Sequence, residues 1–158
     1  MRNPLALARA LALLVPAVAL AVAFGSQYLG GLVPCEMCWW QRYAHMAALA
    51  IALLAFLVRG RSMVLLAALA IAASGAIGVY HAGCELHLYQ CITVCTSTVP
   101  TGGSTEDFLK AIMSRPMVRC DDIQFSFLGI SMAGWNAILS LGSALLILWL
   151  SLRRTRTA

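Results

Sequence analysis

The chain has 158 residues, of which 61% are hydrophobic and 11% are charged, and its formal net charge is +5. Soluble domains carry about 25% charged residues, so this composition excludes an ordinary soluble protein and indicates a membrane protein. The basic residues gather next to long apolar segments. This placement indicates membrane topology and lipid contact, not nucleic-acid binding.

A helix that crosses the bilayer needs about 20 mostly apolar residues. Four windows qualify: 10–29, 39–58, 63–80 and 132–152. The first is too long for the apolar core of a signal peptide, so we expect it to be retained. The composition of these windows favours helices over barrel strands. We therefore predict an all-α membrane protein in which residues 1–158 form a single four-helix transmembrane bundle.

The arginines set the predicted orientation. They precede the first window, occupy the turn between the second and third, and follow the fourth: Arg2, Arg9, Arg59, Arg61, Arg153, Arg154 and Arg156. Basic loops stay on the cytoplasmic side of a membrane, so we expect both termini to be cytoplasmic. The two remaining segments, 30–38 and 81–131, then face outward, and all six cysteines share that compartment.

The second outward loop is long and carries most of the polar residues. Residues 96–104 are rich in Thr, Ser, Gly and Pro and are predicted to be a flexible link. Residues 104–113 have an N-cap candidate in Ser104 and apolar residues at helical spacing. They predict a short helix that lies either on the membrane surface or against other loop residues.

Cys35 and Cys38 stand just before the second window. The positive end of a helix dipole favours thiolate over thiol, so this position is typical of a reactive pair. Arg42 lies one turn after Cys38 on the same face, where its charge would stabilise a thiolate or hold a carbonyl oxygen of a ligand. The alternatives are an Arg42 that snorkels to the membrane interface and a structural role for the pair, as a static disulfide or half of a zinc site. Because no second Cys-x-x-Cys is present, we expect no metal.

Five stretches carry a family resemblance: 34–42 (PCEMCWWQR), 80–83 (YHAG), 95–96 (CT), 115–121 (RPMVRCD) and 127–136 (FLGISMAGWN). Together with the four-span layout, they resemble the DsbB family of disulfide-bond-formation membrane proteins. The resemblance implies a bacterial inner-membrane thiol oxidase. It would reoxidise a periplasmic, thioredoxin-fold, DsbA-like partner and pass the electrons to a membrane quinone, either ubiquinone or menaquinone.

The resemblance also implies roles for single residues. Cys95 matches the cysteine that forms the mixed disulfide with the partner, and Cys120 matches the cysteine paired with it. Cys35 matches the cysteine that exchanges with Cys120. Cys38 and Arg42 match the cysteine and the arginine beside the quinone. The implied disulfides are Cys35–Cys38 and Cys95–Cys120.

Cys84 and Cys91 depart from the family pattern. We expect them to form a structural disulfide in the outward compartment, with metal binding and redox switching as the alternatives. Four loop cysteines allow three pairings, so Cys91 in place of Cys95 also stays open.

Two other functions remain open from the sequence. One is a non-catalytic four-helix membrane scaffold with structural disulfides. The other is a thiol carrier that moves electrons across the membrane, but that function needs cysteines inside the spans, and the predicted spans contain none.

Overall fold

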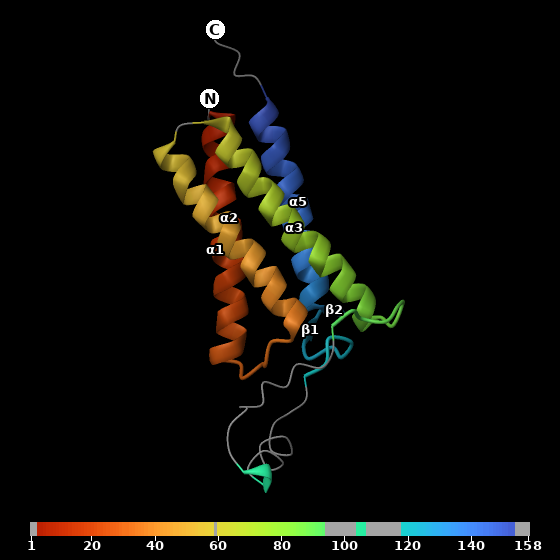
Figure 1. The fold of residues 1–158 in the computed structure, drawn as a ribbon. Coiled ribbons are helices and arrows are strands. Elements are labelled where there is room, and N and C mark those ends of the chain that lie inside the picture. The colour runs from red at the N-terminus through yellow and green to blue at the C-terminus, as the bar shows by residue number, and fades with distance from the viewer. Residues whose placement is uncertain (1–2, 59, 94–103, 107–117, 154–158) are drawn as a thin grey trace.

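The computed structural model describes residues 3–58, 60–93, 104–106 and 118–153. In this part of the chain, four helices are long and apolar enough to cross a membrane. They are α1 (Pro4–Tyr28), α2 (Glu36–Leu57), α3 (Arg61–Glu85) and α5 (Met132–Leu152). Figure 1 shows them side by side as one bundle. The prediction of an all-α, four-helix membrane protein is confirmed.

Capping residues explain where α1 and α5 begin. Asn3 caps α1 by accepting the backbone N–H of Leu5 at 3.0 Å, and Pro4 occupies the first helical position, where its missing N–H costs nothing. Ser131 caps α5 in the same way, with 3.1 Å between its Oγ and the amide nitrogen of Gly134. Both helices therefore begin where side chains satisfy otherwise unpaired donors.

The helices extend beyond three of the hydropathy windows. Helix α1 begins at Pro4, six residues before its window, α2 begins at Glu36, and α3 continues to Glu85, five residues beyond its window. His81 and Cys84, in the predicted second outer loop, therefore belong to the last turns of α3. Hydropathy falls at His81, but the helix continues there with its polar end packed against other segments: His81 and Cys84 are almost completely buried.

Different segments of the chain lie at the two ends of the bundle. Both chain termini and the turn between α2 and α3 lie at one end, and the cysteine-bearing segments lie at the other (Figure 1). Helices α3 and α5 approach each other closely at Gly78. A Cβ atom added there would lie 3.0 Å from backbone atoms of Ala133 and of Ala137. This contact lets side chains of α3 and α5 meet in the bundle interior.

A short hairpin precedes α5, although the sequence analysis predicted no strand. Strands β1 (Ser126–Phe127) and β2 (Ile130–Ser131) pair antiparallel through a two-residue turn. Leu128 and Gly129 in this turn have φ values of 54° and 75°, as a tight hairpin turn requires. Of the predicted short helix, Thr105 and Glu106 are helical; residues 107–113 and residues 96–103 of the predicted link lie outside the described residues.

Candidate functional site

Cys35 and Cys38 occupy the first turn of α2. Cys35 is the N-cap residue, and its sulfur accepts the backbone N–H of Cys38 at 3.3 Å. The two Sγ atoms are 3.0 Å apart and both residues are free thiols. The two sulfurs are adjacent, and the Cys35–Cys38 disulfide stays a prediction.

Cys120 reaches the same helix end from the second loop. It is buried, it packs with Cys35 and Met37, and its thiol is free. Its interaction with the Cys35 thiol and with the backbone N–H groups of Met37 and Glu36 lowers the pKa of Cys120 to about 6.

Cys35 has the opposite character. Its pKa is raised by its interactions with Cys120 and Cys38 and by burial. Its thiol donates to the Cys38 sulfur. Cys95 lies outside the described residues, and so does the predicted Cys95–Cys120 disulfide.

Arg42 is buried and held by the first helix. Its guanidinium donates to the side-chain oxygen of Gln27 and, at 2.9 Å, to the backbone oxygen of Ala23. The Phe24 and Trp39 rings each lie with their centroid 4.9 Å from the guanidinium carbon. These contacts bury the guanidinium between α1 and α2.

His81 of α3 lies beside the cysteine pair. Its Nε2 is 3.5 Å from the Cys35 sulfur and 3.8 Å from a carboxylate oxygen of Glu85. Its Nδ1 is 2.9 Å from the amide nitrogen of Gln41. Ser131 donates to the other oxygen of the Glu85 carboxylate. The cap residue of α5 is thereby tied to the last turn of α3.

A potential metal-ligand group exists here although no metal was predicted. The ligand atoms of Cys35, Cys38 and His81 all lie within 4.8 Å of one another. Structural zinc sites use four such ligands, and each ligand must offer a free lone pair. The suitability of this group therefore depends on which ring nitrogen of His81 carries the proton.

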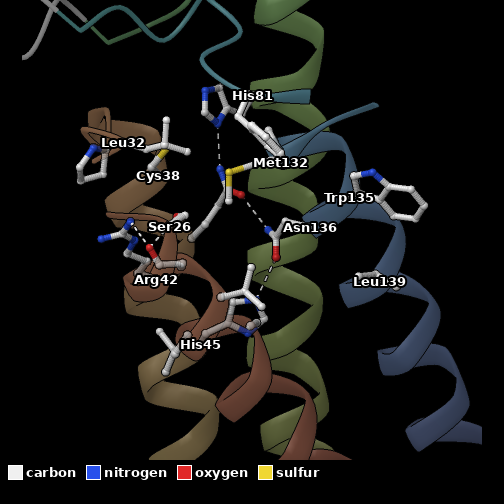
Figure 2. A pocket seen from close by; sticks show the side chains of 18 of the residues that line it. Ser26, Leu32, Cys38, Arg42, His45, His81, Met132, Trp135, Asn136 and Leu139 are labelled. Atoms are coloured by element: carbon white, nitrogen blue, oxygen red, sulfur yellow. Dashed lines mark hydrogen bonds between the residues drawn. The ribbon is translucent and has the colours of Figure 1, made fainter. Parts of the chain in front are cut away.

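A cavity of about 690 Å³ adjoins this cluster. Figure 2 shows Cys38, Arg42 and His45 of α2, His81 of α3, and Asn136 and Leu139 of α5 around it. Apolar side chains of α1 form much of its wall: Leu14, Val15, Val18, Leu20 and Val22. Leu14, Val18, Val22 and Leu139 line the cavity and are also more than half exposed. The cavity therefore reaches the outer surface of the bundle on the side of α1 and α5.

Cys84 and Cys91 are joined as a disulfide, with 5.5 Å between their Cα atoms. The bridge encloses the end of α3 and the turn after it. Tyr89, within the bridged loop, stacks on Tyr80 with 4.9 Å between ring centroids and donates to the Tyr80 carbonyl at 2.9 Å. These contacts are those of a rigid structural element.

Sequence reasoning missed four participants in this site: Gln27, Gln41, Glu85 and Asn136. Gln41 and Asn136 fall within the recognised stretches, yet nothing in their own pattern pointed to a role. An uncharged polar residue inside an apolar window was the available signal, because such a residue must find partners within the bundle. His81 and His45 are also buried and hydrogen-bonded.

Comparisons with known proteins give a consistent result. The family model of "Disulfide bond formation protein DsbB" matches residues 6–150. A relative named disulfide bond formation protein B, from Marinobacter nauticus (strain ATCC 700491 / DSM 11845 / VT8), is 34% identical over 91% of this chain and 90% of its own length. A protein of Rickettsia prowazekii (strain Madrid E) named as uncharacterized, RP370, is 27% identical over 78% of this chain and 74% of its own. No solved structure matches the chain.

Proposed function

The chain belongs to the DsbB family of disulfide bond formation proteins, and from this premise we propose that it is a quinone-dependent thiol oxidase. It would reoxidise a DsbA-like dithiol oxidase by disulfide exchange and deliver the electrons to a membrane quinone. The observation that carries the proposal is the placement of Cys38 and Arg42 on the wall of an apolar cavity that reaches the surface of a membrane-spanning bundle.

The cavity fits a quinone by size and by chemistry. Its volume of about 690 Å³ lies in the range of pockets for small organic ligands, about 300–1,000 Å³. Exposed apolar residues on α1 and α5 line its wall, so a ligand dissolved in the bilayer would enter from the lipid side. The Arg42 guanidinium would hold a ring carbonyl and the Cys38 sulfur would lie beside the ring. A quinone bound there supplies an acceptor for two electrons and two protons.

The proposed exchange begins at the loop. A partner thiolate attacks Cys95 of the Cys95–Cys120 disulfide; a bond from the partner to Cys95 forms, and Cys120 takes the electron pair as a thiolate. The backbone N–H groups of Met37 and Glu36 lower the pKa of Cys120 whether or not Cys35 carries a proton, and a more acidic thiol leaves faster, which supports this step. A hollow of about 470 Å³ beside Cys120, lined also by His87, Gln90 and Arg119, gives a polar surface where a soluble partner could approach.

The second exchange transfers the electrons to the membrane edge. The Cys120 thiolate attacks Cys35; the Cys35–Cys120 bond forms, the Cys35–Cys38 bond breaks, and Cys38 leaves as a thiolate beside the cavity. The second thiolate of the partner attacks the partner–Cys95 bond, so the partner disulfide forms and Cys95 leaves as a thiolate. Cys95 then attacks Cys120, which re-forms the Cys95–Cys120 disulfide and releases Cys35. The packing of Cys35 and Cys120 in one buried cluster supports this route, since it brings the two reacting residues together. DsbA oxidants are poised near −120 mV, so their reoxidation needs a strong acceptor such as a quinone.

We also propose the bacterial inner membrane as the location, with the cysteines on the periplasmic side. Arg9, Arg61 and Arg153 belong to the end of the bundle that carries the termini, opposite the cysteines (Figure 1). By the positive-inside rule this end faces the cytoplasm. In whole cells, a membrane-impermeant maleimide should label the reduced cysteines; labelling only after membrane disruption would reverse the orientation.

One reconstituted assay tests the proposed function. The purified protein in detergent is mixed with a reduced DsbA-like protein and either short-chain ubiquinone or menaquinone, and quinone absorbance is followed. We expect one quinone reduced for each partner disulfide formed, and none with the Cys38→Ser variant. Folded protein that reduces neither quinone would overturn the proposal and favour the non-catalytic scaffold.

A further inference from the structure

A chain of buried hydrogen bonds runs from the middle of the bundle to Cys35, and its direction can be worked out atom by atom. The chain begins at Asn136 of α5. The Asn136 amide nitrogen is 3.1 Å from the backbone oxygen of Ser74, and a carbonyl oxygen can only accept. The amide nitrogen is therefore fixed on that side, and the Asn136 side-chain oxygen faces His45 at 2.9 Å and Ser140 at 3.0 Å.

Gln41 of α2 is fixed by two contacts. Its amide nitrogen is 3.3 Å from the backbone oxygen of Met37, again an obligate acceptor. Its amide oxygen receives the Asn136 amide nitrogen at 2.7 Å. With both ends assigned, the Gln41 N–H points at Nδ1 of His81, 2.9 Å away.

The tautomer of His81 follows from that contact. Since Nδ1 accepts a hydrogen bond, the neutral ring carries its proton on Nε2. This Nε2–H faces the Cys35 sulfur at 3.5 Å and Glu85 at 3.8 Å (Figure 2 shows the link from His81 toward Asn136). A metal ion bound with Cys35 and Cys38 would need a free lone pair on Nε2, so this hydrogen-bond chain opposes the metal site as well.

We propose that Asn136 and Gln41 are positioning residues that hold His81 as an Nε2–H donor to the sulfur of Cys35. The inference rests on the proposed function, because it assigns these residues to the chemistry of Cys35. Each of the two amides is locked by a backbone carbonyl, so the donors all run in one direction, from Asn136 through Gln41 and His81 to Cys35.

The role of this donor is to favour the Cys35 thiolate. When the reduced Cys35–Cys38 pair is oxidised, two thiol protons are lost, two electrons go to the quinone, and a sulfur–sulfur bond forms. Cys35 holds its proton tightly, because burial and its hydrogen bonds to neighbouring sulfurs oppose ionisation. The N–H of His81, together with the backbone N–H of Cys38, stabilises the anion that must form.

Several charged or titratable groups face Cys35 and bear on its titration. Cys38 lies on α2, His81 and Glu85 lie on α3, and Cys120 belongs to the segment before β1. The measurement therefore uses a variant that retains the Cys84–Cys91 bridge and Cys35, with Cys38, Cys95 and Cys120 changed to Ser. Its thiol titration then reports Cys35 alone.

The first test reads the tautomer directly by nitrogen NMR of isotope-labelled histidine in the complete protein. The chain has three histidines, so His45→Gln and His87→Gln variants assign the signals. We expect His81 to show a protonated Nε2 and a bare Nδ1. Gln41→Glu, which removes the donor to Nδ1 while keeping size, should protonate Nδ1. A protonated Nδ1 in the neutral His81 ring of the unaltered chain, or a bare Nδ1 in Gln41→Glu, would overturn the proposal.

The second test asks whether Asn136 acts on Cys35 through His81. We expect Asn136→Leu to lower the Cys35 thiolate fraction, followed by its ultraviolet absorbance across pH, by about two- to fivefold. In a His81→Leu background the same substitution should have no further effect. Ser140→Ala is the matched control, since Ser140 also bonds Asn136 but lies off the path to His81. An equal effect of Asn136→Leu in both backgrounds would contradict the positioning role.

Both tests use no quinone and no partner, so their outcome is separate from that of the reconstituted assay. Failure of the assay with the tautomer as expected would remove the oxidase function and leave the hydrogen-bond chain as an element of the bundle core. Failure of the tautomer test with quinone reduced normally would remove the positioning role alone.

Discussion

The half of the bundle with the chain termini and the half with the cysteines bury different side chains on the same four helices. The terminal half has a dry core of small and aliphatic residues: Ala8, Ala12, Ala48, Ala52, Ala55, Val64, Ala67, Ala68, Ile71, Ala144, Ile147 and Leu150. The cysteine half buries many polar side chains, whereas the terminal half buries one among the described residues, Ser151. Those of the cysteine half are Gln41, Arg42, His45, Ser74, His81, Glu85, Ser131 and Ser140. Small residues let helices pack closely where lipid gives no hydrophobic drive between them.

This difference in buried side chains suggests that the terminal half stabilises the fold and the cysteine half carries the chemistry. A buried polar group in a membrane protein costs free energy unless it finds partners, and each residue of the cysteine half listed above makes at least one hydrogen bond, while Nδ1 of His45 has no partner. These hydrogen bonds converge on Cys35 and the cavity. Changes in the cysteine half should therefore alter electron transfer first, and changes in the terminal half should alter the stability of the fold first.

The largest expected effect is at Cys38. Cys38→Ser removes the thiolate beside the cavity, so quinone reduction should fall below detection, while Cys35 remains available for exchange with Cys120. A trapped complex with the reduced partner should still appear on a non-reducing gel. Thermal unfolding should change little, because serine keeps the size of the side chain. Normal quinone reduction by this variant would mean that electrons take another path.

The next effect concerns the acidity of Cys120. Its pKa of about 6 lies well below the ordinary value of 9.0, so its thiolate should be present above pH 6 and be lost as the pH falls through 6. Alkylation of Cys120 by iodoacetamide in the reduced protein should follow this titration. Cys35→Ala removes the strongest of the hydrogen bonds to Cys120 and should move the midpoint upward. A midpoint near 9.0 in the unaltered chain would contradict the assigned nucleophile.

Arg42 tests how firmly the cavity binds its ligand. Arg42→Met removes the buried charge and its hydrogen bonds, so the KM for quinone should rise by about tenfold or more, in keeping with the loss of a charged hydrogen bond. Arg42→Lys keeps the charge but loses the fork that reaches both Gln27 and Ala23, and should lie between. Steady-state kinetics across quinone concentration gives both values. An unchanged KM with loss of folded protein would make Arg42 an anchor alone.

The sequence predicted the terminal half better than the cysteine half. The apolar windows predicted the four helices, since helix formation in a membrane depends mainly on a long apolar segment. The ends of the helices were harder to predict from the sequence. Helix α3 continues through His81 to Glu85 because its last turn packs on residues far along the chain. Hydropathy does not register a tertiary contact of that kind.

Within the site, the sequence located single residues and the structure located their partners. Cys35, Cys38 and Arg42 lie within two successive turns at the start of α2, so their proximity could be predicted from spacing. The contacts of Gln41 with Asn136, and of Arg42 with Gln27, join residues on different helices. Which face of α5 meets α2 depends on close approaches such as that at Gly78, which no local pattern specifies.

The terminal half can be tested with a cavity. Ile147 is fully buried in the dry core of α5, and Leu146 beside it is about half exposed. Ile147→Ala should lower the free energy of unfolding by about 2–5 kcal/mol, the usual loss for a buried aliphatic side chain. Leu146→Ala is the matched control and should have a much smaller effect. The KM for quinone should stay unchanged in both variants. A raised KM in Ile147→Ala would show that the two halves are coupled.

The smallest expected effect on this scale is at the Cys84–Cys91 bridge, which lies in the cysteine half yet, by the comparison above, should behave as a stability element. Removing it with Cys84→Ala and Cys91→Ala should cost about 2–3 kcal/mol, the loop-closure value for a short bridge. Quinone reduction at a temperature where the variant is folded should be unchanged, because Cys95 and Cys120 carry the exchange.

Disulfide mapping of the oxidised protein by mass spectrometry decides between this role and a part in the relay. We expect a Cys84–Cys91 peptide and a Cys95–Cys120 peptide. A Cys91–Cys120 peptide, or loss of quinone reduction in the folded double variant, would place the extra pair among the redox-active cysteines. The polar hollow shared by Cys91 and Cys120 makes that outcome worth measuring, because the two residues line the same surface. If the bridge is structural, the bridged loop and the hollow keep their shape while Cys120 changes its disulfide partner.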